Sequence, residues 1–443
     1  MSFNPFSEKS VPIDETFMNW NTMYPRPYRK ETVDPYTKCR IVLMNGTEFE
    51  AQWFTRQFSR HCCDNDLRRE LAMIRRIEQQ QQKRISCLKP KEETILEHTI
   101  TYEQLAVDLT SVLAKMETDC NVINALNFAL LEDFDHLYRY SNLLHLEYGI
   151  YPEKLVGGYT EITPGRPTIS EHRHPKDSIF KDIDNRTASL QTKLNVNIIT
   201  AAEQQTMNYY MNVASLYNVS DLGRRIYQEI GLIEEEHVSQ YESLIDIRAT
   251  WLESLLMHKY TECYLYYSCM MTECDPYIRN IWEECLQQEL SHLHKAKELL
   301  WKYERKDYES VIGCDGTFPS LLKLGPNINY VRKVLETTVG NTQEKECVVP
   351  LGELPEDARF FSFQKNLNTP LDSVATHCII DRHIRCYGID YRYETAPNPV
   401  ALLQNRTIDN TTLGRVPCET PEHLSRCGTT EDNCRCNLNR IKD

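Results

Sequence analysis

Apolar residues recur at helical spacing through most of the middle of this chain. One clear stripe lies within residues 64–88, where Leu67, Leu71 and Ile74 share a face behind a cap region at its start. Three later segments each have the pattern of two helices joined by a turn, over residues 99–149, 198–245 and 250–304. We therefore expect a mainly α fold, a helical bundle built from three helical hairpins.

The two ends of the chain lack this pattern. Residues 1–50 are rich in proline and aromatic residues and show no helical period, so we expect an arm that lies across another surface. Beyond Glu304 the pattern predicts one helix over residues 327–339, a strand within residues 377–393 and otherwise loop. The expected division is residues 1–95 for the arm and a basic helix, 96–304 for the helical domain and 305–443 for a loop-rich extension.

Acidic residues and histidines in the last two hairpins have the spacing of metal ligands. Glu234/His237 and Glu289/His292 are Glu-x-x-His pairs, and residues at i and i+3 leave the same face of a helix. Carboxylate bundles that bind two metal ions use one Glu from each of two helices and one Glu-x-x-His from each of the other two. The candidate ligands are Glu203, Glu234, His237, Glu262, Glu289 and His292.

Counting from the turns places these acids level with each other. Glu203 lies 15 residues before Asn218 and Glu234 lies 16 after it, so both sit roughly 23 Å from that turn at about 1.5 Å per residue. The other turn, Asp275-Pro276, combines an N-cap acid with proline at the first helical position. Glu262 lies 13 residues before it and Glu289 lies 14 residues after it.

The hairpin over residues 99–149 repeats the same unit and supplies alternative ligands. From the first acid to the second is 30 residues in this hairpin, against 31 and 27 residues in the later two. Three units supply three halves of a two-metal site, so one half is left over unless a second chain contributes, and we expect a homo-oligomer. The alternative ligands are Glu103, Asp133 and His136.

Two arguments disagree about which hairpins share the site. The link near residues 245–250 spans at most roughly 20 Å, too short to cross a bundle with helices roughly 35 Å long. Residues 149–197 are long enough for any crossover. Chain geometry therefore favours pairing the first hairpin with a later one, whereas residue chemistry favours pairing the second with the third. We take the chemical pairing as the first choice and keep the other as the alternative.

Residues 198–304 resemble the rubrerythrin branch of the ferritin-like proteins, chiefly in Glu262-Cys-Tyr-Leu-Tyr-Tyr, Ile281-Trp-Glu and Glu289-Leu-Ser-His292. The resemblance implies a ferritin-like bundle with two iron or two manganese ions, iron preferred, that reacts with H₂O₂ or O₂. Rubrerythrins usually carry a rubredoxin-type iron site, which needs two Cys-x-x-Cys pairs that this chain lacks, so the electron donor is unknown. The tail cysteines could instead bind zinc, form cross-links or be inert; they are Cys418, Cys427, Cys434 and Cys436.

Charge explains why such a cluster needs metal. Four carboxylates converging in a core repel one another by about 4 kcal/mol per pair at 4 Å and an effective dielectric of 20. Two divalent cations neutralise four carboxylates, and imidazoles complete their coordination. The competing interpretation is that these acids lie on the surface of ordinary amphipathic helices. Against it, Glu203 is the only acid between Asn197 and Ser220.

Composition excludes several other classes. A net charge of −14 argues against binding nucleic acid through its phosphates, and the basic face of residues 64–88 is better explained as a solvated face that packs onto an acidic body. No apolar run approaches the length of a membrane span, and Met1-Ser-Phe-Asn-Pro lacks the features of a secretory signal. The 17 cysteines are odd in number and scattered, as reduced thiols are, so we expect a cytoplasmic protein.

Two hypotheses of function follow. The first is a di-metal carboxylate protein with peroxidase-like or ferroxidase-like redox chemistry. The alternative is a structural or assembly protein that uses the bundle as a scaffold without catalysis. The complete ligand set favours the first, whereas the unpaired hairpin, the proline-rich arm and the cysteine-rich tail favour the second.

Overall fold

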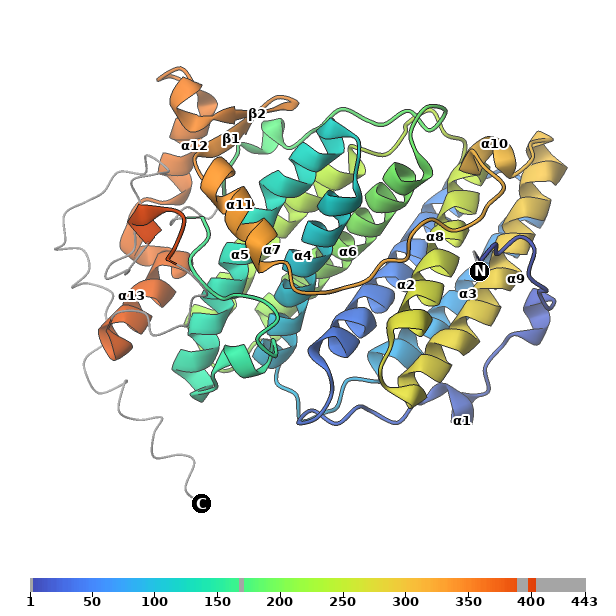
Figure 1. Cartoon of the computed structure of the whole chain (residues 1–443), viewed down its shortest axis with the longest axis horizontal. Helices are drawn as coiled ribbons and strands as arrows, with labels where there is room; N and C mark the ends of the chain where they lie inside the picture. The colour runs from blue at the N-terminus through green and yellow to red at the C-terminus, as the bar shows by residue number, and fades with distance from the viewer. Residues whose placement is uncertain (1–2, 167–170, 389–396, 404–443) are drawn as a thin grey trace.

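The computed structural model describes residues 3–166, 171–388 and 397–403, and these residues are mainly helical, as expected. Long helices follow one another in the chain and pair as hairpins (Figure 1). Their bounds are α2 (Pro35–His61), α3 (Asn65–Ser86), α4 (Ile95–Met116), α5 (Cys120–Tyr148), α6 (Leu190–Leu216), α7 (Asp221–Glu242), α8 (Trp251–Thr272) and α9 (Pro276–Glu304).

Side-chain caps start these helices where the sequence predicts turns. Ser220 caps α7, and Asp275 caps α9 with Pro276 at the first helical position. Helices α4 and α8 both begin with a capping box, in which Thr94 and Thr250 each exchange hydrogen bonds with a glutamate three residues later. Both predicted turns are therefore confirmed.

The hairpins form two four-helix bundles that lie side by side (Figure 1). Bundle A consists of α4, α5, α6 and α7, and bundle B consists of α2, α3, α8 and α9. The bundles meet where α2 packs against α4 and α6, and one continuous hydrophobic core extends through both. The chain thus starts bundle B, builds the whole of bundle A and then returns to complete bundle B.

Helix α2 lies within a stretch where the sequence shows no helical period. Its residues Tyr36–Met44 are all buried, including the charged Lys38 and Arg40, because α2 contacts helices of both bundles. A helical stretch that is covered on all sides, as the first part of α2 is, has no polar stripe, so the periodicity that marks a surface helix is missing there. The expectation that residues 1–50 contain no helix was wrong for the part that begins at Pro35.

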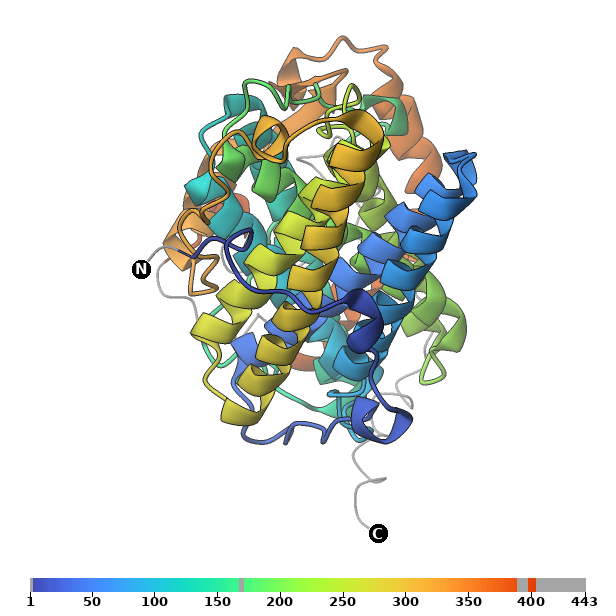
Figure 2. The ribbon, with the colours of Figure 1, turned by 90° about the vertical axis from the view of Figure 1, so that its right-hand side faces the viewer.

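The residues before α2 do form the expected arm. Figure 2 shows this dark-blue segment crossing α8 and α9, with the short helix α1 (Trp20–Met23) near its end. His294 Nε2 lies 3.1 Å from the carbonyl oxygen of Pro5, and Gln288 Nε2 donates to the carbonyl oxygen of Thr16 at 2.8 Å. Both of these side chains belong to α9.

Connection lengths decide which hairpins share a bundle. The described residues between α5 and α6, 149–166 and 171–189, run back along bundle A, which lets the α6–α7 hairpin pack in the sense opposite to the α4–α5 hairpin. Only residues 243–250 separate α7 from α8, so α8 turns away into the neighbouring bundle instead of crossing bundle A. The argument from chain geometry is therefore the correct one.

The part after α9 contains more structure than expected. It holds α10 (Glu309–Ile312), the predicted helix as α11 (Ile328–Thr338), an antiparallel pair of strands, β1 (Asn341–Glu344) and β2 (Cys347–Pro350), and α12 (Arg359–Leu367). The expected strand within residues 377–393 was wrong. Residues Ala375–Tyr387 form helix α13, whose buried Ile379, Ile380 and His383 recur at helical spacing against α5 and α7. The four tail cysteines lie outside the described residues.

Within the described part of the chain, each helix is too short or too polar to cross a membrane.

Candidate metal centre

The middle of bundle A collects six buried carboxylate and imidazole side chains, each at most 3% exposed. Each hairpin contributes the same unit, one acid from its first helix and an acid-x-x-His pair from its second. Equal spacing from the turns brings the units level, as the counting argument predicts. The six residues are Glu103 from α4, Asp133 and His136 from α5, Glu203 from α6, and Glu234 and His237 from α7.

The ligand atoms form two overlapping groups. One group consists of Asp133, Glu203, Glu234 and His237, and the other of Glu103, His136 and Glu234; within each, the ligand atoms lie within 4.8 Å of one another. Glu234 belongs to both groups. Its Oε1 lies 3.0 Å from His136 Nδ1 and its Oε2 lies 3.3 Å from His237 Nδ1. One carboxylate oxygen thus faces each histidine, which is the arrangement of a bridging ligand.

Several of these buried atoms have no hydrogen-bond partner within the described structure. His237 Nδ1 lies 3.3 Å from Asp133 Oδ1 and 3.9 Å from Glu203 Oε2, close enough for an ion pair but without hydrogen-bond geometry. Buried polar atoms are normally hydrogen-bonded, so a convergent set without partners fits a cation. The unpartnered atoms are Glu103 Oε2, both Asp133 oxygens, Glu203 Oε2, Glu234 Oε2 and His237 Nδ1.

A second layer of residues orients the cluster. His237 Nε2 lies 2.9 Å from Glu132 Oε2, and the buried Arg173 lies 3.6 Å from the same carboxylate oxygen. With Nε2 donating to Glu132, His237 presents the lone pair of Nδ1 to the cluster. On the other side, Tyr210 donates a hydrogen bond to Glu103.

Burial makes the charged state of this cluster costly. Burial and the neighbouring Glu234 raise the pKa of Glu103 well above its usual range, and burial and Asp133 do the same for Glu203. Burial alone would also raise the pKa of Glu234, but His136 and His237 outweigh it and lower that pKa to about 2. For His237, burial lowers the pKa, but Asp133 and the other carboxylates outweigh burial, and the net pKa is well above its usual range. The cluster therefore demands protons or other cations.

Sequence reasoning missed the orienting residues for identifiable reasons. Glu132 stands directly before Asp133 on a helix, and an acid next to a candidate ligand carries no distinct signal. Arg173 lies in the long connection between α5 and α6, and its spacing in the sequence does not relate it to Glu132. Tyr210 belongs to a tyrosine-rich stretch of α6, where packing in the core explains an aromatic residue equally well.

The preferred pairing of hairpins was wrong. Glu262, Glu289 and His292 do not join the bundle A cluster but lie in bundle B, where they meet residues of the α2–α3 hairpin. The reason is the short link between α7 and α8. The half that seemed left over has its partner in the same chain, so the site itself no longer calls for a second chain.

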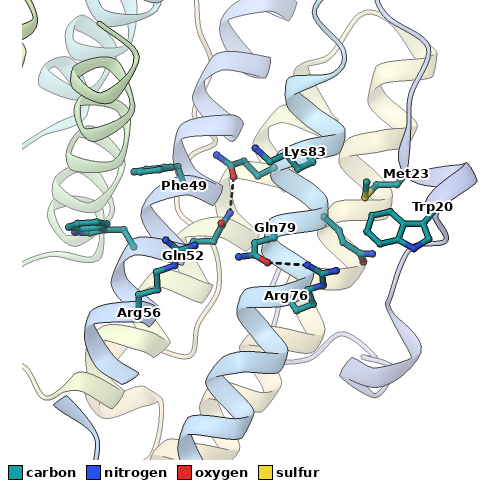
Figure 3. Close-up of a pocket in the computed structure, with 11 residues that line it drawn as sticks. Trp20, Met23, Phe49, Gln52, Arg56, Arg76, Gln79 and Lys83 are labelled. Atoms are coloured by element: carbon teal, nitrogen blue, oxygen red, sulfur yellow. Dashed lines mark hydrogen bonds between the residues drawn. The ribbon is translucent and has the colours of Figure 1, made fainter. Parts of the chain in front are cut away.

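An open pocket of about 410 Å³ lies on the outer side of the α2–α3 hairpin (Figure 3). It is lined by Trp20, Met23, Phe49, Gln52, Trp53, Arg56, Arg76, Gln79, Gln80, Gln82 and Lys83. The basic face of α3 that borders it is mostly exposed, and two of its residues contact other segments of the chain. Arg84 pairs with Glu284 at 2.6 Å, and the Arg76 guanidinium lies over the ring of Trp20 at 5.9 Å. The pocket shares no residue with the bundle A cluster.

Comparison with known proteins gives no family: no family model, curated protein or solved structure matches this chain. The ferritin-like resemblance therefore stays a prediction from the residues. What the structure itself establishes is a mainly α helical bundle with buried acid and histidine clusters that could hold a metal ion.

Proposed function

We propose that bundle A is a ferritin-like di-metal carboxylate centre that performs redox chemistry on H₂O₂ or O₂. The observation that carries the proposal is the position of Glu234, which directs one oxygen to each of two ligand groups. A carboxylate shared in this way would be a ligand in both groups if each held an ion. The assignment to iron or manganese, with iron preferred, comes from the resemblance and from the oxygen and imidazole donors.

Charge balance supports two ions rather than one. The cluster holds four carboxylates, from Glu103, Asp133, Glu203 and Glu234, and two divalent cations neutralise them. A single ion would leave two buried negative charges, which cost several kcal/mol each unless they take up protons. The imidazoles of His136 and His237 lie one on each side of the bridging carboxylate, one for each ion.

The chain's own residues have defined tasks in this proposal. A bound metal pair would supply the electron-accepting and electron-donating capacity. Glu132 and Arg173 hold His237 in the tautomer that binds metal, and Tyr210 holds Glu103 in place. Buried tyrosines beside the cluster would help to exclude bulk water: the Tyr241 ring lies 6.4 Å from the His237 ring, and Tyr140 and Tyr227 pack against Tyr210. The electron donor is an unidentified external partner.

Metal content tests the proposal directly. Protein purified without oxygen should contain about two iron or manganese ions per chain, and peroxide should produce a new optical absorption band. The Glu203→Gln/Glu234→Gln variant should lose the metal and the band, because two carboxylate charges are gone. Glu262→Gln is the matched control, since this acid lies in bundle B and the variant should keep both.

Two results would contradict the proposal. One is wild-type protein without metal after reconstitution with Fe²⁺ or Mn²⁺, which would leave the helical bundle as a scaffold. The other is equal metal content in the double variant and the control, which would place the metal elsewhere. Circular dichroism of each variant separates loss of metal from loss of fold.

A further inference from the structure

Bundle B repeats the acid arrangement of bundle A. Each of its hairpins has one buried acid on the first helix and another on the second, separated by 30 positions in α2–α3 and by 27 in α8–α9. The α2–α3 hairpin is the fourth copy of the unit, which the sequence did not reveal. The four acids are Glu48, Glu78, Glu262 and Glu289, and each is at most 2% exposed.

Two substitutions distinguish bundle B from bundle A. Gln81 stands three residues after Glu78, at the position where the other three units have a histidine. Lys259 stands three residues before Glu262, where the corresponding residue of α6 is Thr200. One substitution removes an imidazole ligand, and the other adds a permanent positive charge.

The Lys259 ammonium group lies where the acids converge. It is fully buried, donates hydrogen bonds to both Glu78 and Glu262, and lies 3.7 Å from Glu289 Oε2. Its four-carbon stem reaches from one turn before Glu262 to this point. Three carboxylates from three helices therefore share one cation that belongs to the chain.

Other side chains of bundle B contact Glu289 and Glu48. Gln81 Nε2 donates to Glu289 Oε1 at 2.9 Å, and His292 Nδ1 lies 2.8 Å from the same oxygen. Tyr266 donates to Glu48, as Tyr210 donates to Glu103 in bundle A. Burial and neighbouring acids raise the pKa of Glu48 well above its usual range, so protons join the lysine in offsetting the acids.

We propose that bundle B is a former metal site whose cation is now supplied by Lys259. Bundle B would then exclude metal while Lys259 is in place, and it would accept metal once Lys259 is removed and a histidine is restored at position 81. This inference concerns binding alone and does not require redox activity in bundle A.

The test uses full-length chains with bundle A disabled by Glu203→Gln/Glu234→Gln and Co²⁺ as the probe. That background should bind no Co²⁺, because Lys259 fills the remaining cluster. Adding Lys259→Met should create weak binding, and adding Gln81→His as well should tighten it by roughly tenfold or more. Visible absorption of bound Co²⁺ reports the nitrogen and oxygen ligands, and elemental analysis gives the stoichiometry.

Either of two outcomes overturns the inference. Bound Co²⁺ in the background with Lys259 in place would mean that bundle B takes metal despite the lysine. A folded Lys259→Met/Gln81→His chain without Co²⁺ would mean that these two residues do not decide metal access. Lys259→Gln is the second variant if the methionine fails to fold. Wild-type protein without metal would contradict the proposed function but leave this test intact.

Discussion

The residues on the two edges of the His237 ring orient it in a way that suits metal binding. Its Nε2 faces Glu132 at 2.9 Å, and its Nδ1 faces the carboxylates of the cluster. Because Glu132 accepts a hydrogen bond from Nε2, the neutral form of His237 has Nδ1 as its acceptor nitrogen. Sequence spacing predicts the ligand pairs, since i and i+3 geometry is local. It cannot predict Arg173 beside Glu132, since their contact depends on the path of a long connection.

Metal affinity should increase with pH. The raised pKa values of Glu103 and Glu203 mean that the metal-free protein keeps protons on these groups above the usual glutamate pKa of 4.5. Metal must displace those protons, so binding tightens as pH rises, with proton release. The same shifts make the metal-free fold less stable as pH rises, because the charged forms are disfavoured in the folded state.

Titration calorimetry with Co²⁺ between about pH 6 and 8, in buffers of different ionisation enthalpy, measures both the affinity and the protons released. The Glu262→Gln chain is the control, because its bundle A is intact. Affinity that does not change with pH and binding without proton release would contradict the assigned protonation of these two acids.

Among the helices, α2 is the element that joins the two bundles. Gly46, in its middle, lies against α6 so closely that an added Cβ would be 2.9 Å from Gln205 Cβ and 3.2 Å from the Ala201 carbonyl oxygen. Glycine inside a helix normally costs about 1 kcal/mol relative to alanine. Here the missing side chain allows the two helices to approach, next to the turn of α6 that carries Glu203.

Replacing Gly46 with alanine should therefore destabilise the protein by about 1–3 kcal/mol, despite the better helix propensity of alanine. Urea unfolding measures the change. Gly231→Ala on α7 is the matched control, because the one tight contact of its new Cβ would be the flexible Met211 side chain at 3.2 Å, with Met211 N and Tyr210 Cβ at an ordinary contact distance of 3.5 Å. A Gly46→Ala chain as stable as the wild type would show that the bundles can separate to accept the methyl group.

Predictability from the sequence differs from helix to helix. The α4–α5, α6–α7 and α8–α9 hairpins follow from caps and periodicity, since both are local. Helix α2 cannot be predicted in this way, because burial on all sides of its first part, Tyr36–Met44, removes the periodicity. Gln81 lies in a glutamine run that carries no signal by itself. The role of Gln81 as a hydrogen-bond donor to Glu289 can be seen only in the folded structure.

In the whole molecule, the two bundles solve the same charge problem in different ways. Each gathers four buried acids, and burial without compensation costs several kcal/mol per charge. Bundle B contains its own cation in Lys259, whereas the described cluster of bundle A includes no lysine and, under the proposed function, would take its cations from solution. The two bundles share one core, so the state of bundle A affects the stability of the entire helical domain.

Metal removal should thus lower the melting temperature of the whole chain. A ligand at 100 times its Kd stabilises the folded state by about 2.7 kcal/mol, and chelation withdraws that stabilisation. Calorimetry with and without a chelator should show the complete unfolding transition moving down by a few degrees. The Glu203→Gln/Glu234→Gln chain should not respond. A shift confined to one of two separate transitions would mean that the bundles unfold independently.

In the chain, the helices of bundle A lie between the two hairpins of bundle B, and this order also sets an order of assembly on the ribosome. Helices α4 to α7 are consecutive, so bundle A can close as soon as Glu242 has emerged from the exit tunnel. Helices α2 and α3 emerge first but must wait for α8 and α9, more than 160 residues later in the chain. Until Lys259 is synthesised, the acids of that first hairpin have no cation and remain in water.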